Sequence, residues 1–375
     1  MSDRVRSVVV VGTGVAGLTT AATLRQKGYD GRLVLVGDEP LPPYRRTALS
    51  KDVLAGKDLP VLKPESWYAD QQVELLTGTA VTALRPGAVE LAGTTMPADA
   101  VVLATGGRAR AVPGLGAALA VRTAADVAGL RPRLVPGARV AVVGAGFLGL
   151  ELAGAALASG CEVTVVEAAP LPLARVLPPF VGEALVRRYA AAGVDLRLGT
   201  TRLPDADVVV VAVGQLPSTE LAETAGAKVA DGIVVDRCGQ TSLPGVWAAG
   251  DCAAFPHRAT GLPARQEHWQ AAMTQGQAVA AAVLGDDTGW TDLPWAWSSH
   301  LGVDLQLCGE PRRADDWAVE GDLQAAFALV TARDGRLTGA VTVDATPRMR
   351  ALRALVAAGE ATTPGQAIGA SAMAR

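Results

Sequence analysis

Six glycines, arranged as two identical triplets, have the spacing of dinucleotide-binding turns. They are Gly12, Gly14 and Gly17 in "VGTGVAG", and Gly144, Gly146 and Gly149 in "VGAGFLG". In a G-x-G-x-x-G turn the first glycine permits the tight turn, the second lets the backbone approach a pyrophosphate, and the third lets the helix pack closely on its strand. The helix N-terminus offers free N–H groups and partial positive charge to the phosphates. One motif alone would also fit an ordinary tight turn, but two indicate a flavin and a nicotinamide.

Acidic residues after each turn distinguish the two nucleotides. Glu167 directly follows the valine-rich "VTVV", where a carboxylate accepts hydrogen bonds from both ribose hydroxyls of unphosphorylated NAD. This position predicts NADH over NADPH, although a surface glutamate at a strand end is the alternative, and Arg175 could soften the preference. In the first unit Gly37 occupies the equivalent position and Asp38 follows it. We assign this shifted acid to the ribose of FAD.

A polar stretch after the first unit, "LPPYRRTALSKDVLAG", brings several cations together. Arg45, Arg46 and Lys51 lie within a few residues of one another. Its prolines and polar residues disfavour a core element. Cations beside a flavin stabilise its reduced forms, because negative charge gathers on the reduced ring. We therefore expect flavin contacts from Arg46 and Lys51, whereas Arg45 fits a solvated surface cation better.

The elements that must position these residues are predicted by valine-rich runs. Residues 7–38 and 139–167 each read as a strand, a glycine turn, an Ala/Leu helix and a second strand. Near-continuous apolar runs are typical of parallel strands buried on both faces. Three further strands end in residues that would face the nucleotides: Ala104, Thr105 and Gly106 after the first, Gly214 after the second, and Gly250 with Asp251 after the third.

Composition narrows the class of protein. The chain has 375 residues, of which 50% are hydrophobic, enough for two or three domains. The formal net charge is -3, so there is no global attraction to nucleic acid or an anionic membrane. No stretch offers about 20 uninterrupted apolar residues, so we expect no membrane span. The four cysteines form no close pair, which disfavours a metal site or a redox dithiol and suits the cytoplasm.

Together these motifs resemble the FAD- and NADH-dependent ferredoxin reductases that serve bacterial dioxygenases and cytochromes P450, relatives of the apoptosis-inducing flavoprotein. The matching segments run nearly end to end and include "PYRRTALSK", "ATGG", "GVWAAGD", "RQEHWQAAMTQGQAVAAAVLG" and "PWAWSSHLGVDLQLCG". The resemblance implies an α/β fold with two Rossmann-like domains and an α+β C-terminal domain. The expected boundaries are 1–112 with 235–290 for FAD, 113–234 for NADH, and 291–375 for the C-terminal domain.

The resemblance also implies roles for individual residues. Lys51 would lie beside the flavin N5 nitrogen, paired with a carboxylate, and Trp297 would flank the flavin; these two are the expected catalytic residues. The expected FAD contacts are Gly12, Gly14, Gly17, Asp38, Arg46, Lys51, Ala104, Thr105, Gly106, Arg110, Gly250, Asp251 and Trp297. The expected NADH contacts are Gly144, Gly146, Gly149, Glu151, Glu167 and Gly214. Glu151 fits a helix surface nearly as well, and His268 could line the nicotinamide side.

Some positions depart from the family pattern. A β-meander usually precedes the strand at 206, but here only a few residues follow "GVDLRLG". Leu216 and Ser218 stand where Arg and Asn are usual. Ser299 and His300 replace an Asp-Gln pair that would lie near the exposed flavin edge. The last change makes the electron acceptor less certain than the cofactors.

The predicted function is electron transfer from NADH through FAD to a small acidic [2Fe–2S] ferredoxin. Two alternatives remain: an NADH-dependent flavoenzyme that reduces O₂ or a small organic acceptor directly, and a non-enzymatic NADH-responsive flavoprotein. A ferredoxin would need a local basic patch, because the net charge does not attract it. Arg348, Arg350 and Arg353 of the predicted helix 347–359 could form this patch, unless they are an ordinary solvated helix face.

Overall fold

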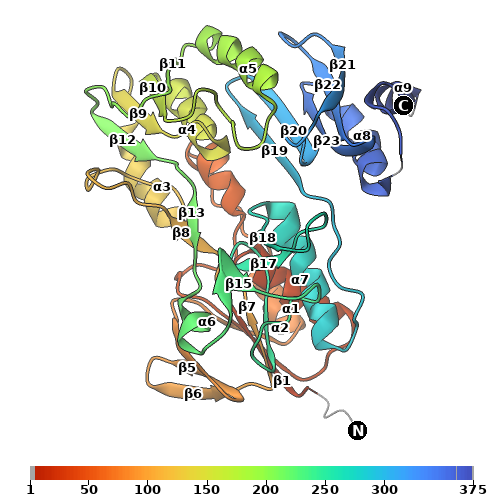
Figure 1. The fold of residues 1–375 in the computed structure, drawn as a ribbon. Coiled ribbons are helices and arrows are strands. Elements are labelled where there is room, and N and C mark those ends of the chain that lie inside the picture. The colour runs from red at the N-terminus through yellow and green to blue at the C-terminus, as the bar shows by residue number, and fades with distance from the viewer. Residues whose placement is uncertain (1–4, 360, 374–375) are drawn as a thin grey trace. The chain divides into compact units, whose positions relative to one another are not determined.

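A computed structural model describes residues 5–359 and 361–373. The chain divides into two units, which Figure 1 shows coloured along the sequence. Unit 1 comprises residues 1–46, 59–108 and 215–292, and unit 2 comprises 47–58, 109–214 and 293–375. Unit 2 therefore holds both the second glycine triplet and the C-terminal region. The three expected domain boundaries stay a prediction.

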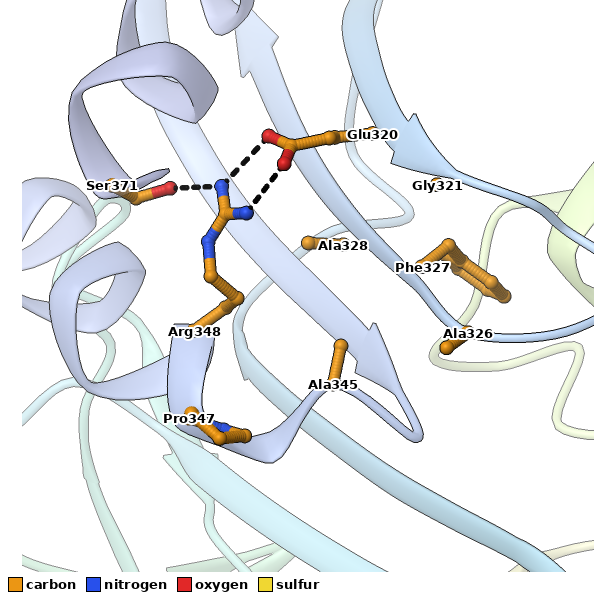
Figure 2. A pocket seen from close by; sticks show the side chains of 9 residues that line it. All are labelled: Glu320, Gly321, Ala326, Phe327, Ala328, Ala345, Pro347, Arg348 and Ser371. Atoms are coloured by element: carbon orange, nitrogen blue, oxygen red, sulfur yellow. Dashed lines mark hydrogen bonds and ion pairs between the residues drawn. The ribbon is translucent and has the colours of Figure 1, made fainter. Parts of the chain in front are cut away.

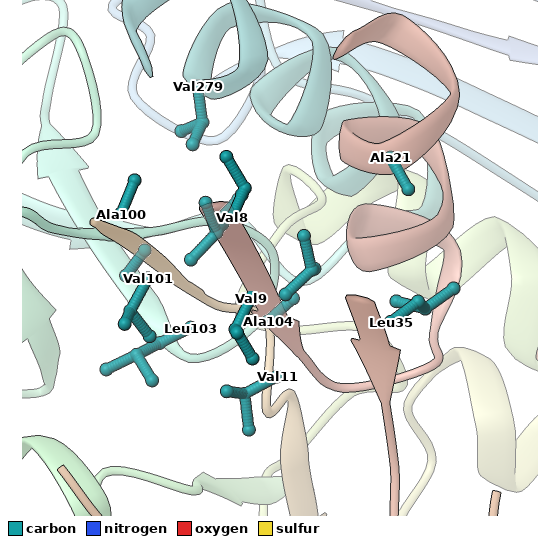
Figure 3. Close-up of a cluster of buried hydrophobic side chains, with 14 of the residues drawn as sticks. Val8, Val9, Val11, Ala21, Leu35, Ala100, Val101, Leu103, Ala104 and Val279 are labelled. Carbon is teal, nitrogen blue, oxygen red and sulfur yellow. The ribbon is translucent and has the colours of Figure 1, made fainter. Parts of the chain in front are cut away.

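A parallel five-stranded sheet, in the order β16-β7-β1-β2-β3, forms the centre of unit 1. Its strands are β1 (Ser7–Val11), β2 (Arg32–Val36), β3 (Val73–Leu76), β7 (Ala100–Leu103) and β16 (Val246–Ala248). Helices α1 (Val15–Gln26) and α7 (Trp269–Val283) pack against each other, and their side chains meet those of β1 and β7 in a buried core (Figure 3). The valine runs are buried on both faces, as expected for parallel strands.

Smaller elements complete unit 1. An antiparallel sheet contains β4 (Val81–Arg85), β5 (Ala88–Leu91) and β6 (Thr94–Pro97). A second small sheet contains β14 (Val229–Ala230), β15 (Gly232–Val234), β17 (Ala253–Pro256) and β18 (Pro263–Arg265). The remaining elements are α2 (Glu65–Asp70), α6 (Glu220–Thr224) and β13 (Gln215–Pro217), while β8 (Gly107–Ala109) and η1 (Arg46–Ala48) lie where the chain passes between units.

Unit 2 begins with a second parallel sheet, in the order β11-β10-β9-β12. It consists of β9 (Arg139–Val143), β10 (Glu162–Glu167), β11 (Asp195–Leu198) and β12 (Val208–Val211), with helices α3 (Ala124–Leu130), α4 (Phe147–Ala158) and α5 (Pro179–Ala191) and the turn η3 (Arg131–Arg133). Residues 199–207, between β11 and β12, contain no strand, in agreement with the short connection expected from the sequence. The turn η2 (Leu49–Val53) packs on α4 within the same unit.

The C-terminal part of unit 2 is an antiparallel sheet in the order β19-β20-β23-β22-β21. Its strands are β19 (Trp295–His300), β20 (Val303–Gly309), β21 (Asp316–Gly321), β22 (Phe327–Arg333) and β23 (Arg336–Val343), followed by α8 (Thr346–Ala358) and α9 (Pro364–Met373). The helix expected at 347–359 is confirmed as α8, and β19 and β21 form the two edges of the sheet. Across the described residues, no helix is long and apolar enough to cross a membrane.

Candidate functional site

The two glycine turns have the same geometry. A Cβ on Gly12 would lie 2.1 Å from the Ala104 carbonyl oxygen, and one on Gly144 would lie 2.5 Å from that of Ala212. Both residues have positive φ, so only glycine fits these tight turns. The middle glycines differ from these, because a Cβ on Gly14 or Gly146 would meet nothing within 4 Å.

Each middle glycine also caps the helix that follows it. Gly14 is the N-cap of α1 and Gly146 is the N-cap of α4. Open space at a helix N-terminus, bordered by free N–H groups, suits a pyrophosphate. The third glycines meet the first at close range: a Cβ on Gly17 or Gly149 would lie 2.0 Å from the carbonyl oxygen of Gly12 or Gly144. Both turns therefore fit a dinucleotide, and neither would tolerate side chains at their outer glycines.

Glu167 ends β10 with its carboxylate fixed at the second turn. One carboxylate oxygen accepts from the Ala145 N–H and the other from the Ala169 N–H, each at 2.8 Å. Ala145 lies between the first two glycines of its triplet, so the carboxylate borders the turn. Carboxylate oxygens can accept further hydrogen bonds, which leaves capacity for ribose hydroxyls.

The shifted acid of the first turn has a structural reason. A Cβ on Gly37 would lie 2.5 Å from the Thr13 hydroxyl oxygen, so no acidic side chain fits there. Asp38 follows and is exposed. Glu39, the next residue, accepts from the Tyr44 hydroxyl at 2.6 Å and from the Arg46 guanidinium at 2.5 Å.

Arg46 is thus engaged within unit 1. Besides Glu39, its guanidinium donates to the Tyr44 hydroxyl at 2.9 Å and lies 5.0 Å from the centre of that ring. Arg45 beside it is exposed, in agreement with a surface position. A guanidinium already oriented by two partners is well placed to present its remaining donors to a phosphate or ring oxygen.

Lys51 has the carboxylate partner that the resemblance implied, and the partner is Glu151. The turn η2 is a single wide π turn, a form often found at functional sites, and it carries Ser50 and Lys51. The Lys51 ammonium lies 2.5 Å from a Glu151 carboxylate oxygen, and the Ser50 hydroxyl donates to the other oxygen at 2.5 Å. Ser298 of β19 donates to the first oxygen, also at 2.5 Å. Glu151 is therefore not a solvated residue on the surface of α4, because its side chain is only 9% exposed.

A cavity of about 350 Å³ opens beside this ion pair. Its lining includes Lys51, Glu151 and Ser159, together with small apolar residues of α4. Water can therefore reach the polar atoms of the pair from this side.

In unit 1, Thr105 and Asp251 are held by the segment after Gly214. The Thr105 hydroxyl donates to the Ser218 carbonyl at 2.6 Å, and the Gln215 amide donates to the Asp251 carboxylate at 2.9 Å. The Gln215 amide oxygen is buried without a partner. Buried polar atoms normally have a partner, so this orphaned oxygen fits a site that a polar ligand completes.

Sequence reasoning did not single out Arg265 and Glu267. The Arg265 side chain is nearly buried and pairs with Glu267 and with Asp231, the latter at 3.0 Å. Burial raises the pKa of Glu267, while Arg265 lowers it by a smaller amount. His268 caps α7, and burial lowers its pKa. The segment "RQEHW" resembles the family pattern and was the signal for these two residues, but only its histidine received an expected role.

The remaining expected FAD residues lie at loop positions. Gly250 has positive φ, and its N–H donates to the Gln275 amide oxygen at 2.8 Å. Arg110 is exposed, and its N–H donates to the Gly214 carbonyl. Gly214 itself has positive φ, and a Cβ there would meet nothing within 4 Å.

Trp297 lies on the exposed face of β19, with its side chain 42% exposed. Its ring centre lies 4.7 Å from that of Trp295, and the Arg353 guanidinium lies 4.5 Å from the Trp295 ring centre. Trp295 itself packs on the buried cluster between the C-terminal sheet and α8, so it lies between the exposed tryptophan and a cation of α8.

Ser299 and His300 lie on opposite faces of β19, with Ser299 exposed and His300 5% exposed, although both line the cavity beside the Lys51–Glu151 pair. Their expected place near the exposed flavin edge stays a prediction. One expectation needs correction. Arg348 is not a cation of an open basic patch. Figure 2 shows its guanidinium held between Glu320 and Ser371, with both Glu320 oxygens within 2.9 Å. Arg350 and Arg353 remain on the accessible part of α8.

Comparisons with known proteins show the family of the chain. Residues 6–203 and 201–276 match the pyridine nucleotide-disulphide oxidoreductase family, and 295–373 match the reductase C-terminal family. The ferredoxin–NAD(+) reductase component of the anthranilate 1,2-dioxygenase system from Burkholderia cepacia is 37% identical, over 96% of each chain.

Two solved structures extend the similarity to the whole fold. The ferredoxin reductase for the CYP199A2 system from Rhodopseudomonas palustris has a TM-score of 0.92 at 34% identity, over 97% of each chain. A chain of the covalent putidaredoxin reductase–putidaredoxin complex has a TM-score of 0.91 at 32% identity, over 98% of this chain and 99% of that one.

Proposed function

Because the chain belongs to the ferredoxin–NAD(+) reductase branch of the pyridine nucleotide-disulphide oxidoreductases, we propose that it transfers electrons from NADH through FAD to a small acidic [2Fe–2S] ferredoxin. One observation supports a ferredoxin as the electron acceptor. The similarity to a chain of the putidaredoxin reductase–putidaredoxin complex extends over 98% of this chain and so includes the C-terminal sheet. An oxidoreductase of this family uses a flavin and NAD(H). The identity of the flavin as FAD is part of the proposal.

The residues that would hold FAD belong to the first glycine turn and the segments around it. Gly14 at the N-cap of α1 leaves room for a pyrophosphate, and the Arg46 guanidinium, oriented by Glu39 and Tyr44, would add donors from the segment after β2. FAD fits better than FMN, because the turn and the acid at Asp38 form a site for an adenylate. Bound FAD would accept two electrons from the nicotinamide and release them singly to the ferredoxin.

The residues that would hold NADH belong to the second turn. Gly146 leaves open space at the N-cap of α4, and Glu167 borders that turn with an oriented carboxylate. No side-chain acid or base is needed for hydride transfer, so positioning and charge carry the catalysis. Lys51 would supply a fixed positive charge, held by Glu151, for the flavin ring.

The ferredoxin would dock where β19 and α8 present Trp297, Trp295 and Arg353. An aromatic pair backed by a guanidinium offers apolar contact area and positive charge together. Arg350 adds a second exposed cation on the same helix. An acidic partner would complement these charges, and its association would weaken with salt.

Purified protein tests the proposal directly. The cofactor is released by heat and identified as FAD or FMN by chromatography, and turnover with NADH is measured with ferricyanide, O₂ and a panel of [2Fe–2S] ferredoxins. We expect FAD, and cytochrome c reduction that depends on a ferredoxin. A colourless protein that takes up no FAD on reconstitution would refute the cofactor. No stimulation by any ferredoxin, with rapid turnover of O₂ or a small oxidant, would favour direct reduction.

A further inference from the structure

A chain of polar side chains extends from the Lys51–Glu151 pair into the core of unit 2. Ser298 contacts Glu151 at 2.5 Å, and the His300 Nδ1 atom lies 3.0 Å from the Ser298 hydroxyl. The His300 Nε2 atom lies 2.7 Å from the Tyr189 hydroxyl. The chain thus links η2, α4, β19 and α5, and nothing in the proposed electron transfer uses its inner half.

The donors of this chain all point toward Glu151. Ser298 has one hydroxyl proton, and at 2.5 Å from a carboxylate it must donate that proton to Glu151. The Ser298 oxygen then accepts from His300, which places a proton on Nδ1. A neutral imidazole with Nδ1–H has a bare Nε2, which accepts from the Tyr189 hydroxyl.

The reverse direction is disfavoured at both ends. If Ser298 donated to His300, Glu151 would need a proton on an oxygen that already faces the Lys51 ammonium at 2.5 Å. If His300 carried two protons, Tyr189 would have to accept from it and would lose its acceptor. Tyr189 is fully buried, and the only hydrogen bond described for its hydroxyl is to His300.

The surroundings of His300 keep it neutral. Burial is the main cause that lowers its pKa to about 4. The charged groups around it are Glu151 of α4 and Asp304 of β20, which oppose the shift, and Lys51 and Arg188, which add to it. Burial also raises the pKa of Tyr189, so no proton leaves the chain at its inner end. The network therefore orients side chains and does not conduct protons inward.

We propose that His300 is a positioning residue: its neutral imidazole, set by Tyr189, holds the Ser298 hydroxyl on Glu151 and so fixes the Lys51 ammonium. The importance of a fixed Lys51 rests on the proposed function. Glu151 then has three donors, Ser50, Ser298 and Lys51, on two oxygens, which leaves its side chain little freedom to turn away.

The backbone next to His300 is itself pinned to α4. Leu301 and Gly302 both have positive φ and close the tight turn between β19 and β20. The Leu301 N atom passes so close to α4 that a Cβ on Gly154 would lie 3.3 Å from it. The absence of a side chain at Gly154 allows this close approach, and the end of β19 packs on the helix that carries Glu151.

The first experiment reads the tautomer of His300 without using activity. Histidine-labelled protein is examined by long-range ¹⁵N–¹H correlation, and the signal is assigned with His300→Asn, because the chain has only three histidines. We expect the neutral Nδ1–H form throughout pH 5–8, and loss of that fixed form in Tyr189→Phe. A Nε2–H form, or an even mixture of tautomers in the unaltered protein, would overturn the proposal.

The second experiment separates positioning from simple core packing. His300→Leu removes the donor to Ser298, whereas the amide nitrogen of His300→Asn can replace Nδ1 as that donor. In flavin-loaded protein we expect NADH–ferricyanide turnover to fall about tenfold in His300→Leu, equivalent to about 1.4 kcal/mol, and less than about threefold in His300→Asn. Thr342→Val, a buried polar-to-apolar change on β23 of the same sheet, is the matched control and should match the unaltered protein, because the Thr342 hydroxyl has no hydrogen-bond partner among the described residues.

The outcomes distinguish this proposal from the function on which it rests. Ferredoxin reduction with equal turnover in His300→Leu and the unaltered protein would overturn the positioning role and leave the function intact. A protein that fails with every ferredoxin, yet has the Nδ1–H form and loses it in Tyr189→Phe, would overturn the function and support the positioning of Glu151. Equal losses in His300→Leu and His300→Asn would assign the effect to packing alone and overturn the proposal.

Discussion

Replacing Glu167 by alanine should shift the preference of the protein from NADH toward NADPH. In the structure the carboxylate accepts hydrogen bonds from two backbone N–H groups, those of Ala145 and Ala169, each at 2.8 Å. The 2′-phosphate of NADPH would meet this carboxylate in the proposed ribose site. Removing the side chain eliminates the repulsion and also frees two N–H groups, which can donate hydrogen bonds to the phosphate.

The size of the effect follows from charge and exposure. Two unit charges about 4 Å apart repel by roughly 4 kcal/mol at an effective dielectric near 20. Glu167 is only partly buried, so solvent and counterions reduce this to about 1.4–2.8 kcal/mol, or about 10- to 100-fold in kcat/KM. Losing the ribose hydrogen bonds should cost NADH about 1.5–3 kcal/mol for a charged acceptor. The ratio of the two cofactors should therefore change by about 10²- to 10⁴-fold.

Steady-state kinetics with both cofactors, at one ionic strength and with ferricyanide as acceptor, tests this prediction. Glu162→Ala is a matched control, because Glu162 is an exposed glutamate at the other end of the same strand. We expect kcat/KM for NADH to fall and that for NADPH to rise in Glu167→Ala only. Equal kcat/KM for the two cofactors in the unaltered protein, or no gain for NADPH in the variant, would remove Glu167 from the ribose site.

Three further predictions follow from the unit 2 contacts. Lys51→Met should lower the free energy of unfolding by about 2–3 kcal/mol in urea titrations, more than Glu151→Gln at about 1 kcal/mol, because Glu151 is 9% exposed and Lys51 33%. Lys57→Met, which breaks an exposed pair with Asp52, should cost less than about 1 kcal/mol, and equal losses in all three variants would contradict this reasoning. Charge reversal of Arg350 and Arg353 to Glu should slow ferredoxin-dependent cytochrome c reduction and abolish most of its salt dependence. Ferricyanide reduction by this variant should stay unchanged, and an Arg197→Glu control should behave as the unaltered protein with both acceptors. An equal loss with ferricyanide would refute the proposed docking surface. Burial lowers the pKa of His300 to about 4, so below pH 6.5 the unfolded chain binds a proton that the folded protein does not. The free energy of unfolding should therefore fall by up to about 3 kcal/mol between pH 6.5 and 4. A His300→Asn variant that loses as much stability over this range would contradict this assignment.

The parts of the site that are local in sequence could be predicted. The glycine turns depend on residues within about six positions, and strand–turn–helix order follows from the same short segments. The absence of an acid at position 37 was visible, although its cause, the Thr13 side chain against Gly37, was not. Lys51 could be assigned a carboxylate partner by resemblance alone. Its identity as Glu151 needs η2 to pack on α4, a contact that no local pattern encodes.

The alternation of side chains in β19 is a periodicity that the sequence does contain. Trp297 was expected to flank the flavin, and a strand reverses its side chains at each residue. Ser298 and His300 therefore had to face the opposite side from Trp297 and Ser299 once "WAWSSH" was assigned to a strand. The prediction that Arg348 belongs to an open basic patch was wrong. The partner of Arg348, Glu320, lies on β21, an edge strand that the apolar pattern did not predict.

The alternation of β19 separates two tasks that electron transfer imposes on one protein. The odd positions face α8: Trp295 packs on the buried cluster beside Arg353, and Trp297 is exposed at the proposed docking surface. Even positions, Ser298 and His300, face inward, where low exposure makes each hydrogen bond to Glu151 stronger and a missing one more costly. A slip of one residue would exchange the two faces, placing an imidazole at the proposed docking surface and a tryptophan against the ion pair. The tight Leu301–Gly302 turn, with both residues at positive φ, fixes the register of β19 against β20 and so opposes that slip.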